Sequence, residues 1–168
     1  MNTGTSIPIK RYSRRPFPDY RFVPGRGPHP TRDPQGHSYN APEEKLDRFE
    51  PADWFQCECY LFGIDLFNHG YWWEAHEALE TVWIAAGRNS RTGLFIQGLI
   101  QIAVAHLKNH QDFTGVAQRM ARAGLEKMAP VKGVFLGIDT GKFRKDVRDW
   151  MNGRRTTPVL IELRFDGR

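Results

Sequence analysis

Apolar side chains recur every three or four positions through most of the chain beyond residue 50. This is the spacing of an α-helix that buries one face. The stretch 92–109 differs because it is apolar nearly all round, which is typical of a central helix. Pro51 suits the first position of a helix, and Gly87 suits a helix end. The pattern predicts helices over residues 51–68, 71–86, 92–109, 113–128 and 140–151.

The two ends of the chain lack this periodicity. Nine of the eleven prolines lie within residues 1–51, so this part cannot be regular helix. Aromatic residues recur among them, which predicts an extended arm packed on a body. The segment Val159–Leu163 is β-prone, has no partner of its own kind, and is expected to lie as an extended strip on the surface.

The predicted fold class is therefore all-α, a compact helical bundle of four to five helices. An extended Pro-rich N-terminal arm, residues 1–50, precedes the bundle domain. That domain, residues 51–168, ends in a C-terminal helix and an extended C-terminal tail.

Composition narrows the class of protein further. With 168 residues, 40% hydrophobic and 26% charged, the chain suits one globular domain and excludes collagen, a disulfide scaffold and wholesale disorder. Its apolar runs fall short of the roughly 18 residues that span a bilayer, and residues 1–10 lack a signal-peptide core. We expect a soluble, cytoplasmic protein that does not enter a membrane. Cys57 and Cys59 are expected to be free thiols, one of them buried.

The net charge of +5 is unevenly distributed. Residues 1–32 hold seven basic and one acidic residue, 33–131 hold eight and thirteen, and 132–168 hold nine and five, which gives +6, −5 and +4. A basic arm can bind the phosphates of nucleic acid or lie along the acidic middle of its own chain. The acidic middle favours the second interpretation.

The candidate chemistry lies in the second predicted helix. On a wheel of 100° per residue, Glu80 lies about 40° and Glu77 about 100° from His76, among tryptophans that include Trp73 and Trp83. Carboxylates rarely share an apolar arc unless they are paired or bind a metal. Three uses remain open: a metal site, an acid–base or ligand site, and a buried hydrogen-bond network.

In the metal interpretation, His76 and Glu80 are the ligands of a divalent ion at positions i and i+4. Glu77 is then the candidate general base, and His76 is the second candidate catalytic residue. The His-Glu-x-x-His pattern of zinc proteases is absent, so a further ligand must come from elsewhere. The candidate residues for it are His29, His37, His69 and His106.

The third predicted helix adds Gln97 and Gln101, again at i and i+4, within an otherwise apolar segment. Buried amides need partners, and the carboxylates of the second helix are natural ones. The candidate ligand-binding residues are Glu80, Gln97, Gln101, Trp73 and Trp83.

Three blocks of this sequence occur in the order seen in a known family. They are Phe67–Trp83, with the run FNHGYWWEAHEALETVW, then Phe95–Ala103, with FIQGLIQIA, and Gly115–Ala117. Over roughly residues 55–128 the chain resembles the bacterial and archaeal helical family called domain of unknown function 309. The resemblance implies a compact helical bundle and brings no activity with it. The positions that match its signature are Glu74, His76, Glu77, Glu80, Trp83, Gln97, Gly98 and Gln101.

Two functions follow as hypotheses. The first is a bundle that binds a small-molecule ligand or a divalent metal on the second helix, facing the third, with hydrolase-like chemistry. The alternative is a non-enzymatic interaction module that uses its basic arm to bind an acidic partner or nucleic acid. A homodimer is compatible with both, and whether the protein is an enzyme stays open at this point.

Overall fold

The computed structural model describes residues 8–165. Within them, five α-helices, one 3₁₀ helix and one short hairpin follow each other along the chain. They are η1 (Pro51–Gln56), α1 (Glu58–Asn68), α2 (Trp72–Ala85), α3 (Arg91–His110), α4 (Thr114–Met128), β1 (Val134–Phe135), β2 (Ile138–Asp139) and α5 (Thr140–Met151). The predicted all-α bundle with an extended arm and tail is confirmed.

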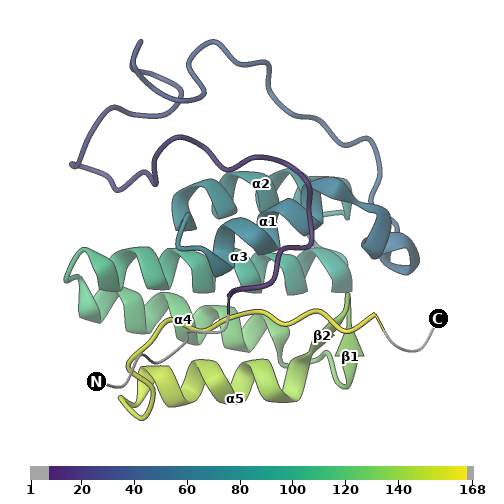
Figure 1. Ribbon diagram of the computed structural model, residues 1–168. Coiled ribbons are helices and arrows are strands. Elements are labelled where there is room, and N and C mark those ends of the chain that lie inside the picture. Colours follow the sequence, from purple (N-terminus) through teal and green to yellow (C-terminus); the bar gives the residue numbers. More distant parts are fainter. Residues whose placement is uncertain (1–7, 166–168) are drawn as a thin grey trace.

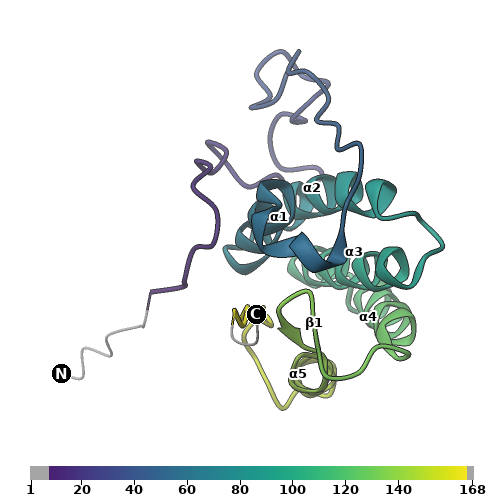
Figure 2. The ribbon, with the colours of Figure 1, turned by 90° about the vertical axis from the view of Figure 1, so that its right-hand side faces the viewer.

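The helices form layers, with α3 in the centre (Figure 1). Helix α3 packs against α2 on one side and α4 on the other, which explains why its sequence is apolar nearly all round. Phe95, Ile96, Leu99 and Ile102 on α3 are fully buried. Most of the arm lies on the side of the bundle opposite α5, as the two views agree (Figures 1 and 2). No helix within residues 8–165 has both the length and the apolar character needed to cross a bilayer.

Helices α3 and α4 approach closely because two glycines face each other across their interface. A Cβ on Gly98 would lie 2.5 Å from the Met128 Cγ atom and 2.8 Å from the Gly124 carbonyl oxygen. A Cβ on Gly124 would lie 2.7 Å from the carbonyl oxygen of Gly98. The absence of side chains here lets the two backbones touch.

The helix predicted over residues 51–68 is in fact two elements. Cys57 has extended backbone angles and separates the 3₁₀ helix η1 from α1. The break sets Trp54 across Tyr60, with 6.1 Å between ring centroids, and above Gly137 of the hairpin. Helix periodicity alone does not reveal such a break, because apolar residues continue both before and after Cys57.

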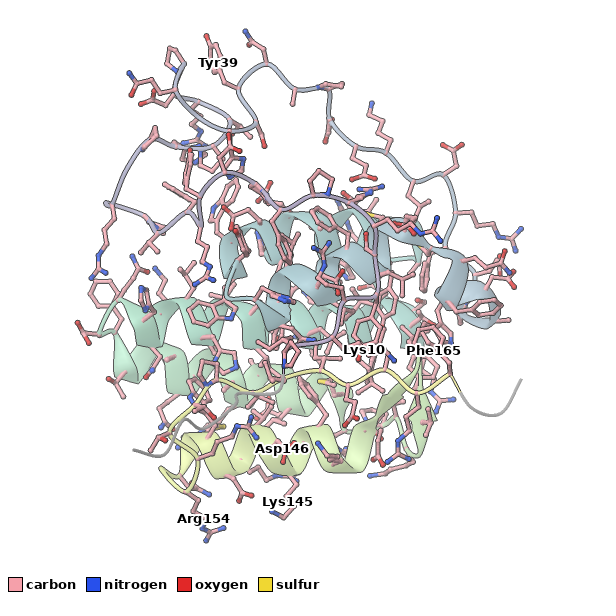
Figure 3. The ribbon with its side chains drawn as sticks, viewed as in Figure 1. Lys10, Tyr39, Lys145, Asp146, Arg154 and Phe165 are labelled. Carbon is pink, nitrogen blue, oxygen red and sulfur yellow. The ribbon has the colours of Figure 1, made fainter. Side chains whose placement is uncertain are left out.

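The C-terminal tail is extended, as predicted, and buried side chains hold it in place. The Asn68 side chain accepts from the Ile161 amide and donates to the Ile161 carbonyl, both at 2.7 Å. The Leu163 amide donates to the Tyr12 hydroxyl at 3.0 Å. Leu163 also pairs with Ile138, so the tail does have a β partner, which the sequence did not reveal. Lys10 lies beside Phe165 of the tail, with 5.8 Å from Nζ to the ring centroid (Figure 3).

A buried carboxylate of α1 anchors the first residues of the arm to the bundle. Asp65 of α1 is fully buried and accepts from the amides of Tyr12 and Ser13 at 2.8 Å and from the Arg11 guanidinium at 2.9 Å. Further along the arm, Phe17 stacks on Tyr71 with 4.9 Å between ring centroids. An extended arm with few backbone partners of its own is therefore ordered by side chains of the bundle.

Candidate functional site

The cluster singled out in the sequence lies on the outer side of α2. Gly70, with a φ of +80°, turns the chain between α1 and α2, a conformation that favours glycine. Helix α2 then buries Ala75, Leu79 and Val82 against the core. His76, Glu77 and Glu80 project on a different side, where their side chains are 33%, 47% and 41% exposed.

The three side chains converge. The His76 Nδ1 atom lies 3.0 Å from a Glu77 carboxylate oxygen, and its Nε2 atom lies 3.9 Å from a Glu80 oxygen. One ligand atom from each residue lies within 4.8 Å of the others, which is a spacing that one metal ion can bridge. The hydrogen bond that His76 donates to the Glu77 carboxylate, and then the charge of both carboxylates, hold the pKa of His76 above its ordinary value despite partial burial. The cluster thus concentrates negative charge around a basic nitrogen.

The third residue of the cluster is Glu77, the neighbour of His76 in sequence. Glu77 completes the cluster, and the four histidines considered as ligands lie elsewhere within the described residues. His29 packs on Trp73, His69 bonds to the Asp65 carbonyl, His37 contacts Glu74, and His106 is buried beside Trp72.

The buried carboxylate of α2 is Glu74, which the helical wheel placed about 160° from His76. It is 5% exposed, and its Oε1 atom accepts from the Phe22 amide at 2.8 Å and lies 3.0 Å from His37 Nε2. Its Oε2 atom is buried without a hydrogen-bond partner among residues 8–165. Sequence reasoning assigned Glu74 no role because the arm, and not the bundle, covers this side of α2.

A cleft of about 1010 Å³ opens between the arm and helices α1 and α2, and we call it the arm cleft. Trp73, Glu74, Glu77, Glu80 and Ile84 of α2 form one wall of it. The opposite wall is formed by arm residues, among them Thr31, His37, Ser38 and 41–47. Figure 3 shows Tyr39 at the outer end of this arm loop, away from the helices. Two of the three cluster residues, Glu77 and Glu80, therefore also line the arm cleft.

The remaining predicted ligand residues are dispersed. Trp73 lines the arm cleft and packs edge-on against Phe22 of the arm. Trp83 donates from Nε1 to the Arg88 carbonyl at 3.2 Å, beyond the end of α2. Gln101 lies against Gly124 of α4, with its Oε1 atom buried and unpartnered among the described residues. Gln97, also on α3, is half-buried. A ligand-binding role for the two glutamines and Trp83 stays a prediction.

Among the described residues, the basic segment 8–32 makes two ion pairs with acidic residues of the segment 33–131. Arg11 pairs with Asp65, and Arg15 forms two hydrogen bonds with Glu44, at 2.8 and 2.6 Å. The Arg15 guanidinium also lowers the pKa of the Glu44 carboxyl. Arg26 and Arg32 stay exposed. Nucleic-acid binding by the arm stays a prediction.

Fold and site together define a small helical-bundle domain with an acidic cluster on its second helix. Residues 60–120 match the family model described as domain of unknown function (DUF309). Over these residues the chain is similar to this family, and the resemblance based on its signature is confirmed. The matched range runs from within α1 to the middle of α4 and contains the whole cluster. No curated protein matches the chain.

Proposed function

We propose that this domain binds one divalent transition-metal ion through His76, Glu77 and Glu80. The observation that carries the proposal is the convergence of one ligand atom from each residue to within 4.8 Å. Imidazole and carboxylate are the donors that Zn²⁺ and its neighbours accept in proteins. The partial exposure of all three side chains supports the proposal, because an ion can enter without unfolding α2.

Three protein ligands leave at least one coordination position open, which is typical of a catalytic rather than a structural site. A divalent ion at such a site lowers the pKa of a bound water and so supplies a hydroxide at neutral pH. Glu77 and Glu80 also line the arm cleft, so a substrate bound in the cleft would lie beside the residues that would hold the ion. We therefore propose metal-assisted hydrolysis as the reaction class, with His76, Glu77 and Glu80 holding the ion that would activate the water.

The test is the metal content of untagged protein dialysed against Zn²⁺ or Mn²⁺ and then against buffer. The proposal expects about one ion per chain, which is lost in His76→Ala. His110→Ala is the matched control, because His110 is an exposed histidine of α3 outside the cluster. Circular dichroism checks that both variants keep the fold, as expected for side chains outside the core.

Acid provides a second readout of the same site. Protonated imidazole cannot bind a metal, and the pKa of His76 is raised by its carboxylate neighbours. Metal is therefore expected to leave as the pH falls through this raised pKa. Glu80→Gln is expected to shift the pH at which the metal leaves. Wild-type protein without bound metal under metal-replete conditions, or equal metal loss in His76→Ala and His110→Ala, would refute the proposal.

A further inference from the structure

The arm cleft is strongly acidic although the whole chain is basic. Six carboxylates line it against one lysine, Lys45: Glu43, Glu44, Asp47, Glu74, Glu77 and Glu80. The negative charge of Glu44 is compensated by the Arg15 guanidinium, which donates two hydrogen bonds to it. Carboxylates that face each other across a cleft with apolar walls focus a negative potential into it. The negative charge of the cleft therefore favours the binding of a cation.

An independent observation points to one carboxylate oxygen in the wall that could accept a hydrogen bond from a ligand. Glu74 lines the cleft and is 95% buried, and its second oxygen, Oε2, is itself buried and has no partner among the described residues. Its first oxygen is occupied by the Phe22 amide and by His37. A buried carboxylate oxygen without a donor is costly. An ammonium group supplies both the charge and the hydrogen bond that this oxygen lacks.

The size and lining of the cleft distinguish an organic cation from a metal ion. Its volume of about 1010 Å³ far exceeds a single ion and suits a chain of several carbon atoms. Phe62, Trp73 and Ile84 also line the cleft and contribute apolar surface to it. Methylene groups can lie on this surface, and an aromatic face such as that of Trp73 attracts a neighbouring cation.

We propose that the arm cleft binds an aliphatic polyamine, with one ammonium group on Glu74 Oε2 and another on Glu77 or Glu80. The ligand and the arm would then share Glu74, one oxygen each. A bound amine should therefore also hold the arm more firmly on α2. The inference goes beyond the proposed metal site and needs neither a metal nor His76, which does not line the cleft.

The test is isothermal titration calorimetry with spermidine at low salt and in the presence of a chelator, with butanediol as an uncharged reference. Spermidine is expected to bind and butanediol is not. Glu74→Gln keeps the shape of the side chain and removes its charge, so the dissociation constant for spermidine should rise about tenfold or more. Protease cleavage of the arm should slow when spermidine is bound to the wild-type protein.

A second variant does not touch the contacts between Glu74 and the arm. Ile84 lines the cleft and is 49% exposed, so Ile84→Lys adds a cation there without disturbing the core. Phe113→Lys is the matched control, because Phe113 is 53% exposed and lies outside the cleft lining. Ile84→Lys is expected to weaken spermidine binding about tenfold and Phe113→Lys to leave it within about twofold.

The outcomes separate this inference from the metal proposal. Absence of spermidine binding, equal binding of butanediol, or equal effects of Ile84→Lys and Phe113→Lys would overturn the polyamine site. Because the titration is done in chelator, none of these results bears on the metal. Conversely, His76→Ala is expected to lose the metal while the spermidine affinity stays within about twofold.

Discussion

Acid is expected to destabilise this protein through His106. This side chain of α3 is 2% exposed and lies between Trp72 and Trp150, whose ring centroids are 5.7 and 4.3 Å away. Its Nε2 atom accepts from the Val159 amide at 3.3 Å, so the folded ring is neutral. Burial, with a smaller contribution from the charge of Arg155, lowers the pKa of His106 from 6.5 to about 3.

The sign of the effect follows from the two states. Between pH 6.5 and about 3 the unfolded chain binds a proton at His106 that the folded chain excludes, so the free energy of unfolding falls as the pH falls. The slope approaches about 1.4 kcal/mol per pH unit. Between about pH 7 and pH 5, His106 alone should remove roughly 2 kcal/mol of stability.

The assay is urea unfolding at about pH 7 and about pH 5, followed by tryptophan fluorescence and circular dichroism. His106→Gln keeps an acceptor for the Val159 amide and does not titrate. Between about pH 7 and about pH 5, the free energy of unfolding of this variant should therefore fall by roughly 2 kcal/mol less than that of the wild type. His110→Gln, at an exposed site, is the control. Equal pH dependence in wild type and His106→Gln, or a His106 ring that titrates near pH 6.5 by NMR, would refute the reasoning.

Two further predictions concern packing and thiol reactivity. Gly98→Ala should lower the free energy of unfolding by about 1–3 kcal/mol, because its Cβ would lie 2.5 Å from Met128 Cγ. Gly115→Ala, whose Cβ would meet nothing closer than 3.8 Å, should be neutral or stabilising in the same urea titration, and equal losses would contradict the close-approach argument. Burial raises the pKa of Cys59 to about 12, so Ellman's reagent at about pH 8 should label only half-buried Cys57 quickly. Loss of that fast reaction in Cys57→Ser would agree with this, and a fast reaction that persists would count against it.

Much of the bundle was predictable because its helices bury a stripe of their own. The apolar spacing located α2 to α5 within two residues at each end, and the all-round apolar character of α3 indicated its central place. The hairpin was missed because strands of two residues carry no periodic signal. The break at Cys57 was missed because both sides of it keep apolar residues.

The site was only partly predictable for a related reason. The wheel found His76, Glu77 and Glu80 together because residues three and four positions apart on a helix are neighbours, which places Glu80 beside both Glu77 and His76. It could not find the burial of Glu74, which depends on Phe22 and His37 of an arm more than thirty positions away in sequence. A wheel describes one helix and does not include a segment that folds over it.

The hydrogen bond between the Leu163 amide and the Tyr12 hydroxyl joins residues 151 positions apart. Closing a loop of this length in an unfolded chain costs about 4 kcal/mol in entropy, more than one hydrogen bond returns. Asp65 and Asn68 on α1 reduce that cost, because the first binds the arm and the second binds the tail. Once both are engaged, the remaining loop is short. Without α1 to hold both segments, the contact between the arm and the tail is therefore not expected to form by itself.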